Sequence, residues 1–236
     1  MDWLRNRRRR QAEWMDEDRA DPEQLLRSLR FIRRINSLLG YTRAIIDHLE
    51  QFARSWLPGE RIDIIDLATG SADIPRAILA WANRRGFDVH IVAVDRHPVT
   101  IRAAAAGEAD PRLRLVQADV FDLPFAAGSF DYAMTAMFMH HLDEDQIIRL
   151  LKGMDRLSRR GILAADLLRH RRAYLWIRLL TLRSTAMVKH DAAASVAQSL
   201  TQTEVLAIRD RAGVGYARYA RHFAHRFVLA GQKPLD

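Results

Sequence analysis

Hydrophobic residues recur at two different spacings along the chain, and the change between them divides the sequence in two. Between residues 21 and 56, Leu and Ile return every three or four positions with Arg in the gaps, which is typical of amphipathic helices. Gly40 predicts a break between two helices, and Pro58 with Gly59 marks the end of the second. We therefore expect residues 1–58 to form an N-terminal helical cover.

After Gly59, short apolar runs alternate with helical stretches. This order is typical of a buried parallel sheet built from strand–helix–strand units. The predicted strands are residues 62–67, 89–94, 113–117, 132–136, 162–165, 216–219 and 226–230. The fold class expected for residues 59–236 is α/β, with a Rossmann-like, doubly wound and mainly parallel sheet of these seven strands.

Capping residues mark several of the predicted helices. Asp73 is expected to cap a helix that ends at Gly86, and Thr201 with Glu204 forms a capping box for a helix that ends at Gly213. Each signal places a helix after a predicted strand, as the alternating order requires.

Residues 168–200 interrupt this order, as an insertion between the fifth strand and the last helix. We expect them to form a substrate lid. Two alternatives stay open, a dimer contact and a peripheral membrane contact through residues 171–183, where Leu and Trp stand beside Arg.

Composition narrows the classes of function. The 236 residues contain no Cys, which excludes disulfides, thiolate zinc sites and Cys nucleophiles. The net charge is +8, and five Arg lie within residues 5–10; this basic N-terminus is either a solvated end or a contact for a membrane surface or polyanion. Neither a signal peptide nor a membrane-spanning run is recognisable, so we expect a cytoplasmic protein, whose oligomeric state the sequence leaves open.

Three acidic residues stand at the ends of three successive predicted strands: Asp66, Asp95 and Asp119. Ligands of open parallel sheets bind beyond these ends, and a carboxylate there can accept hydrogen bonds from ribose hydroxyls. Residues 68–73 form a turn of small residues but lack the glycine pattern for a pyrophosphate, and the acid at the following helix start would repel phosphate. A dinucleotide ligand is therefore disfavoured.

Residues 60–166, with a continuation to 231, resemble the class I S-adenosylmethionine-dependent methyltransferases, closest to the small-molecule type called type 11 or ubiquinone/menaquinone-biosynthesis-like. The segments that carry this resemblance are residues 66–73, Asp95, residues 118–120 and residues 136–142. It implies S-adenosyl-L-methionine as the cofactor. The resemblance, together with the residues at the strand ends, predicts a cofactor site made of Asp66, Ala68, Thr69, Gly70, Asp95, Arg96, Asp119, Val120, Ala136 and Met137.

Within that site, the resemblance implies that the backbone of Ala68 and Gly70 passes along the methionine part. Asp119 would face the adenine amine, and Val120 would pack on the ring. Ala68 and Ala72 depart from the family, where many members have Gly; alanine is tolerable at both positions if they keep a negative φ.

His140 and His141 follow the fourth strand, where the methyl group should be presented. An imidazole suits a general base for a hydroxyl acceptor at neutral pH, so either is a candidate catalytic residue; capping or packing of the next helix is the alternative. We expect no metal, because adjacent side chains point in different directions and no carboxylate follows at ligand spacing.

A small aromatic or apolar acceptor is expected, since the candidate pocket residues are aromatic or Met. The predicted pocket is Tyr41, Phe138, Met139, Tyr174 and Trp176, with Trp14 and Met187 as further candidates. A specific nucleic acid is not expected, because no recognisable binding module or Cys nucleophile is present. The function predicted is methyl transfer, most simply O-methylation, to a phenolic, polyketide-like or quinone-like molecule; carbon methylation of a quinol is the nearest variant, and the alternatives are a nucleic-acid methyltransferase and a non-catalytic cofactor-binding protein.

Overall fold

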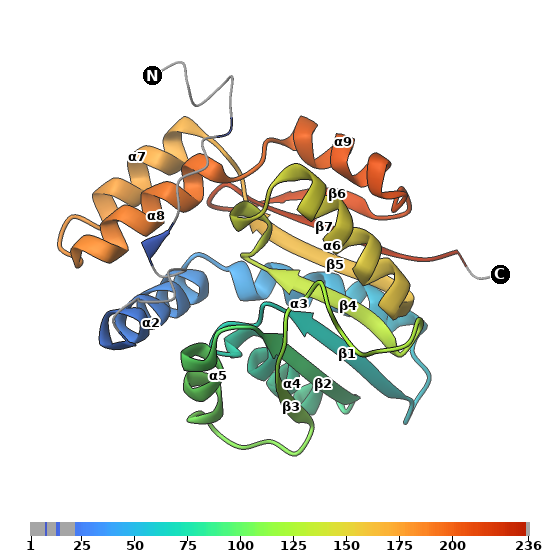
Figure 1. Ribbon diagram of the computed structural model, residues 1–236. Coiled ribbons are helices and arrows are strands. Elements are labelled where there is room, and N and C mark those ends of the chain that lie inside the picture. Colours follow the sequence, from blue (N-terminus) through green and yellow to red (C-terminus); the bar gives the residue numbers. More distant parts are fainter. Residues whose placement is uncertain (1–7, 9–12, 15–21, 235–236) are drawn as a thin grey trace.

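The computed structural model describes residues 8, 13–14 and 22–234, and its centre is one seven-stranded sheet (Figure 1). The strands are β1 (Arg61–Leu67), β2 (Asp88–Asp95), β3 (Leu113–Gln117), β4 (Phe130–Ala136), β5 (Ser158–Leu167), β6 (Arg218–His222) and β7 (Arg226–Gln232). They lie in the order β3-β2-β1-β4-β5-β7-β6. β7 pairs antiparallel with β5 and β6, whereas all the other pairs are parallel. The predicted fold class is confirmed.

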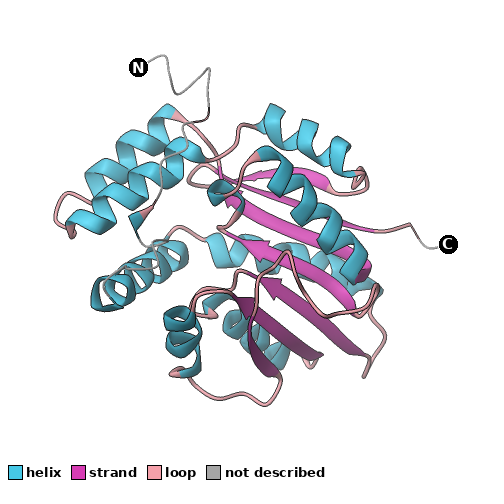
Figure 2. Ribbon diagram, in the orientation of Figure 1, coloured by secondary structure: helices cyan, strands magenta, loops and turns pink. Residues whose placement is uncertain are grey.

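Helices cover both faces of this sheet (Figure 2). The helices are α2 (Pro22–Leu38), α3 (Tyr41–Phe52), α4 (Asp73–Arg85), α5 (Pro98–Ala105), α6 (Glu144–Leu157), α7 (Arg171–Leu180), α8 (Ala186–Gln198) and α9 (Gln202–Ala212), with short 3₁₀ turns η2 (Ala53–Ser55) and η3 (Met139–His141). Alternate residues of β1 show why two layers form: Ile62 and Ile64 pack against α3 and α4, whereas Ile65 and Leu67 belong to the core under α6 and α9.

The capping signals are mostly confirmed. Thr201 and Glu204 make the predicted capping box of α9, and Gly86 and Gly213 end α4 and α9 in the left-handed conformation. One expectation was wrong: the N-cap of α4 is Ala72, and Asp73 is the first helical residue, where its charge still favours the helix N-terminus.

The insertion is more regular than its sequence suggests. Residues 185–199 are weakly patterned, yet they contain α8, which is capped by the Thr185 side chain. α8 carries buried residues on several sides because it packs against α7, α2 and η3. Surrounded in this way, α8 needs no single apolar stripe, which explains the weak periodicity. No helix in the described part of the chain is long and apolar enough to span a bilayer.

Candidate active site

One large cavity of about 1840 Å³ opens where the parallel strands end. β1, β2 and β4 run in the same direction, so Asp66, Asp95 and Ala136 come together at one edge. All the residues predicted for the cofactor line this cavity: Asp66, Ala68, Thr69, Gly70, Asp95, Arg96, Asp119, Val120, Ala136 and Met137. Both predicted catalytic residues, His140 and His141, line it as well.

The turn after β1 forms the floor of the cavity. The Thr69 N–H donates to the Val94 carbonyl oxygen at 2.9 Å, and the Gly70 N–H donates to Asp95 Oδ2 at 3.0 Å. Gly70 has φ +60°, and the space where a Cβ would stand is empty out to 4 Å. A ligand can therefore approach the backbone of Gly70 closely.

The condition of a negative φ is not met at the two alanines of this turn. Ala68 has φ 59° and Ala72 has φ 57°, both in the left-handed region that disfavours residues with a Cβ. The turn reverses the chain within a few residues, while the N–H groups of Thr69 and Gly70 remain hydrogen bonded to Val94 and Asp95 of β2. These constraints override the preference of alanine for a negative φ.

Asp66 is a buried carboxyl at the end of β1. It is 1% exposed, and its Oδ1 atom has no hydrogen-bond partner within the described structure; the same holds for the nearby Thr69 Oγ1. Burial raises the pKa of Asp66 to about 7; the neighbouring Thr69 hydroxyl opposes this rise, and the charge of Asp95 adds to it. Orphaned polar atoms lining a cavity indicate a site that a polar ligand completes.

The remaining acids differ in their surroundings. Burial raises the pKa of Asp95 although its carboxylate accepts two backbone N–H groups, from His97 on Oδ1 at 2.9 Å and from Gly70 on Oδ2. Asp119 is exposed, and its Oδ1 accepts the Phe121 N–H at 2.9 Å. Each carboxylate oxygen can accept more than one hydrogen bond, so both side chains keep acceptor capacity toward the cavity.

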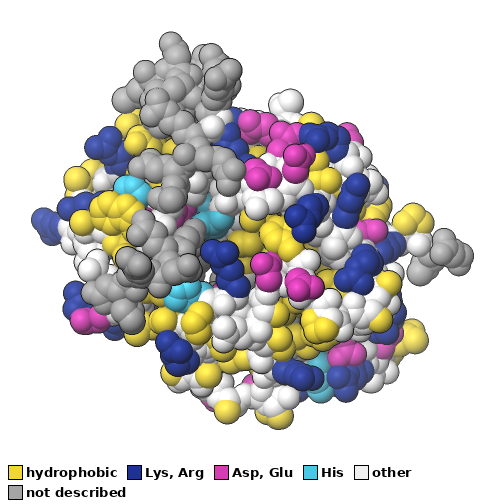
Figure 3. Space-filling model, in the orientation of Figure 1, with side chains coloured by type: hydrophobic (Ala, Val, Ile, Leu, Met, Phe, Trp, Pro, Cys, Tyr) yellow, Lys and Arg dark blue, Asp and Glu magenta, His cyan; other side chains and the backbone are white. Residues whose placement is uncertain are grey.

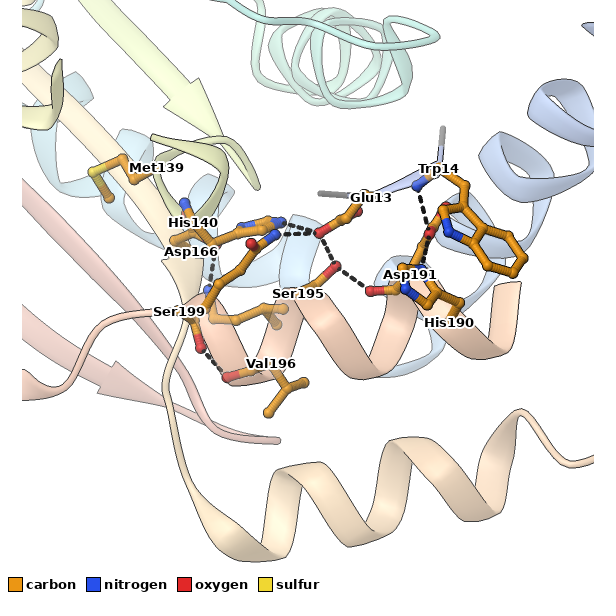
Figure 4. A network of polar contacts seen from close by, with 12 residues as sticks. Glu13, Trp14, Met139, His140, Asp166, His190, Asp191, Ser195, Val196 and Ser199 are labelled. Carbon is orange, nitrogen blue, oxygen red and sulfur yellow. Dashed lines mark hydrogen bonds and ion pairs between the residues drawn. The ribbon is translucent and has the colours of Figure 1, made fainter. Parts of the chain in front are cut away.

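His140 is held by Asp166, which the sequence analysis did not identify (Figure 4). The His140 ring is buried, with Nδ1 at 2.6 Å from Asp166 Oδ1, while the His140 backbone N–H donates to Asp166 Oδ2 at 2.9 Å. Burial alone would raise the pKa of Asp166, but the His140 charge, the ring hydrogen bond and two backbone N–H donors together lower it. An ionised Asp166 accepts a hydrogen bond from Nδ1, which orients the ring so that Nε2 points toward Glu13.

A second carboxylate approaches the other side of this ring. Glu13 Oε1 lies 3.7 Å from His140 Nε2 and accepts hydrogen bonds from Ser195 Oγ at 2.6 Å and Gln198 Nε2 at 2.8 Å (Figure 4). Both of these donors belong to α8, in the predicted insertion. Glu13 is buried and lines the cavity.

Arg8 and Trp14, the other described residues near Glu13 in the sequence, contact η3 and α8. Arg8 donates to the backbone carbonyls of Met139 at 3.0 Å, His140 at 2.9 Å and Gln198. The Trp14 N–H donates to Asp191 Oδ1 at 2.9 Å, and its ring stacks on His190 (Figure 4). Of these three residues, Glu13 lines the cavity beside His140, whereas Arg8 and Trp14 contact η3 and α8 outside its lining.

Asp166 and Glu13 differ in how they could have been found. Asp166 stands near the end of β5, so it extends the series of acids at strand ends that drew attention to Asp66 and Asp95. Glu13 carries no such signal, because nothing in its local sequence indicates that the N-terminal segment returns to the sheet edge.

Glu13, His140 and His141 also meet the geometric requirement of a cation site. Each offers a ligand atom, and these atoms lie within 4.8 Å of one another. The sequence analysis expected no metal because no nearby carboxylate follows the histidines; the structure supplies one from the far end of the chain. His141 is half-buried, and its ring centroid lies 4.2 Å from that of His140.

Three of the seven candidate acceptor residues line the cavity: Tyr41, Phe138 and Trp176. The other four do not: Trp14, Met139, Tyr174 and Met187. Met139 is 1% exposed in the core under α6, and Tyr174 lies beneath the Arg178 guanidinium on α7. A side chain on a short helix can face the core or the cavity, and only packing decides which.

Comparison with protein families finds a match to a methyltransferase domain over residues 64–161. A comparison with curated protein sequences finds no match. Solved structures with a similar fold include human N-acetylserotonin methyltransferase in complex with S-adenosylmethionine, with TM-score 0.64, 17% identity, and coverage of 91% of this chain and 57% of that one. The chain therefore spans little more than half of this relative.

This chain covers a larger share of two further proteins of similar structure. The plantazolicin methyltransferase BpumL in complex with S-adenosylhomocysteine has TM-score 0.63, 13% identity, and coverage of 88% of this chain and 77% of that one. A methyltransferase from Aquifex aeolicus, described as dependent on S-adenosylmethionine, has TM-score 0.55, 15% identity, and coverage of 90% and 98%.

The residues at the sheet edge fit S-adenosylmethionine. The open space at Gly70 admits a ligand next to the backbone, and Asp66 provides a buried carboxyl oxygen that lacks a partner. Asp73 in the first turn of α4 would repel a phosphate but not a cationic sulfonium compound. Residues 64–161 match a methyltransferase domain, and the fold of the chain is similar to that of solved S-adenosylmethionine-dependent methyltransferases.

Proposed function

We propose that the protein transfers a methyl group from S-adenosylmethionine to an oxygen of a small phenolic, polyketide-like or quinone-like acceptor. The cofactor supplies an electrophilic methyl group on a sulfonium. Its ribose hydroxyls would be held by Asp95, its adenine amine by Asp119, and its methionine part would lie along the backbone of Ala68 and Gly70. The acids at the strand ends support this assignment, since each keeps acceptor capacity toward the cavity.

The hydrogen bond between His140 and Asp166 carries the proposal for oxygen as the methylated atom. With Nδ1 hydrogen bonded to Asp166, the other ring nitrogen, Nε2, which lies 3.7 Å from Glu13 Oε1, would be the base for a hydroxyl proton. Asp166 then stabilises the imidazolium that forms, in the same way as the acid of a catalytic triad orients and stabilises its histidine. Removing the acceptor's proton makes its oxygen a stronger nucleophile toward the methyl group.

The cavity has room for both the cofactor and an acceptor, and its walls favour an acceptor that is largely apolar. Its volume of about 1840 Å³ exceeds the range of roughly 300–1,000 Å³ common for a single small ligand. Beyond the sheet edge, α2 supplies a wall of Leu25, Leu29, Phe31 and Ile35, and Phe138 stands next to the histidines. Glu13, His140 and His141 place polar groups beside these apolar side chains, which favours an acceptor with a hydroxyl on a largely apolar body.

The first experiment tests cofactor binding and the class of acceptor. Isothermal titration calorimetry of the full chain with S-adenosylhomocysteine should give binding at tens of micromolar or tighter. Transfer of a labelled methyl group should then appear in an organic extract and not in total RNA. Absence of binding overturns the proposal, and labelling of RNA would establish a nucleic-acid acceptor instead.

The second experiment tests the base. His140→Asn should lower turnover by about 10²-fold or more, because a positioned general base contributes roughly that much. His141→Asn is the matched control and should lower it by less than tenfold, while both variants keep their affinity for S-adenosylhomocysteine. Equal effects of the two substitutions would refute His140 as the base.

A chelator separates base catalysis from metal chemistry at the same residues. If His140 acts as a base, turnover in excess EDTA should match turnover in untreated buffer. Loss of activity in EDTA, restored by a divalent cation, would assign Glu13, His140 and His141 to a metal site.

A further inference from the structure

α7 presents large apolar side chains to solvent. Leu175, Trp176, Leu179 and Leu180 on this helix, and Leu182 just after it, are 49–62% exposed. None of the residues of α7 is fully buried. The spacing of three and four residues places the four helical positions on one broad face. Such a contiguous apolar surface on a protein marks a site of interaction.

Basic residues surround this apolar face. Arg172, Arg178 and Arg183 are all exposed, and residues 168–183 contain five Arg but no Asp or Glu. In Figure 3, hydrophobic and basic side chains gather on the left of the molecule, where Figure 1 draws α7 and α8. An amphipathic helix that combines Trp and Leu with flanking Arg has the chemistry of a helix lying in the interface of an anionic membrane.

The same face borders the entrance of the active-site cavity. Trp176 and Leu180 line the cavity although each is about half or more exposed, so they stand at its rim. Phe223, in the turn between β6 and β7, is 80% exposed and also lines the cavity. Aromatic and aliphatic side chains thus continue from the outer surface of α7 into the pocket.

We propose that α7, together with Phe223, docks on the surface of an anionic lipid bilayer and places the mouth of the cavity against the lipid. Apolar side chains enter the boundary between headgroups and acyl chains, while the arginines contact the negatively charged headgroups. This docking goes beyond the proposed methyl transfer and does not depend on it. In combination with that function, it predicts an acceptor with an apolar chain that leaves the bilayer through the mouth.

Vesicle binding by the full chain tests the proposal. The protein should co-sediment with vesicles of phosphatidylcholine and phosphatidylglycerol more strongly than with phosphatidylcholine alone, and added salt should weaken the binding. The triple variant Leu175→Ser/Leu179→Ser/Leu182→Ser should bind these vesicles at least tenfold more weakly. None of these three leucines lines the cavity, so affinity for S-adenosylhomocysteine should stay unchanged and will show that the variant is folded.

A control variant and a conservative variant complete the test. Arg54→Glu/Leu57→Ser changes one exposed charge and one exposed leucine near η2, and should bind vesicles like the native chain. Addition of anionic vesicles should shift the tryptophan emission to shorter wavelengths, and Trp176→Phe, which preserves an aromatic ring, should remove most of that shift.

Three outcomes would overturn the proposal. The first is no binding to either kind of vesicle. The second is unchanged binding by the triple variant, which would assign the contact to the basic residues 5–10. The third is a dimer in sedimentation velocity that the triple variant converts to a monomer, which would show that a second copy covers this face.

Discussion

At the scale of single residues, the structure places unfavourable groups at the cofactor end of the cavity. Asp66 is buried with one oxygen unpartnered, and Ala68 and Ala72 adopt a left-handed backbone. These groups cost stability in the free protein. They lie where the proposed cofactor could supply the missing hydrogen-bond partner. The free protein would then be less stable, but its binding site would already have the conformation that binding requires.

Asp66→Asn tests the cost of the buried carboxyl. The folded pKa of about 7 lies above the ordinary value of 3.8, so the folded state holds more protons between these values and native stability falls as pH rises through this window. At pH 8 the variant should be more stable than the native chain by about 2–4 kcal/mol, because a tenfold change in a proton-binding constant corresponds to about 1.4 kcal/mol.

Urea denaturation at several pH values provides the measurement. The advantage of Asp66→Asn should vanish below pH 4, where both states of the native chain are protonated. Asp88→Asn, an exposed carboxyl at the start of β2, is the control and should change stability by less than about 0.5 kcal/mol throughout. A pH-independent effect of Asp66→Asn would contradict the assigned cause.

Ala68→Gly tests the strain in the turn. A left-handed conformation destabilises a residue with a Cβ by about 1–2 kcal/mol, and substitution by glycine removes this strain. Glycine also has a larger conformational entropy in the unfolded state, which offsets part of the stabilisation. The net expectation is stabilisation by up to about 1 kcal/mol in thermal unfolding. Ala207→Gly, at an exposed position of α9, should instead destabilise by about 1 kcal/mol, and the same sign for both would disprove the strain.

At the scale of elements, periodicity identified every strand, and the errors lie at boundaries and in the insertion. β3 has the predicted bounds, whereas β5 begins four residues earlier than expected, at Ser158. The early part of β5 contains two Arg and is polar enough to resemble a loop, but hydrogen-bonded neighbours on both sides extend the strand. Strand ends depend on partners that the local sequence does not contain.

Two glycines show how differently the elements use this residue. A Cβ on Gly161 of β5 would collide with the backbone carbonyl of Gly231 in β7, so Gly161→Ala should cost about 3 kcal/mol. Gly153 lies inside α6 with nothing near its Cβ position, so Gly153→Ala should stabilise by about 0.5–1 kcal/mol. Thermal unfolding should give a lower midpoint for Gly161→Ala and a higher midpoint for Gly153→Ala. A lower midpoint for both variants would show that the position of Gly153 in α6 does not accept a Cβ.

At the scale of the whole molecule, the active site joins segments from both ends of the chain. Glu13 and Ser195 are 182 residues apart in sequence, yet their side chains are hydrogen bonded beside His140. Under the proposed function, the donor half of the cavity would be lined by the ends of β1, β2 and β3, and the acceptor half by Glu13, α2 and residues 168–200. Substitutions in the two halves should therefore have separable effects.

Glu13→Gln tests this separation. The amide oxygen can still accept from α8, but the negative charge beside His140 is lost, so an imidazolium formed during turnover is less stabilised. We expect kcat to fall about tenfold. Affinity for S-adenosylhomocysteine should not change. Glu23→Gln, an exposed carboxyl on α2, should leave both quantities unchanged. A weaker cofactor affinity in Glu13→Gln would show that the halves are coupled.

The sequence alone determined the sheet, its covering helices and the sheet edge at which the cofactor is proposed to bind. Apolar runs identify buried strands, and the carboxyl ends of parallel strands must meet at one edge, so Asp66, Asp95 and Asp119 could be grouped without coordinates. Only the tertiary structure decided the left-handed backbone of Ala68, the pairing of His140 with Asp166, and the return of Glu13 to the site. These depend on contacts between segments distant in sequence, and local periodicity contains no information about such contacts.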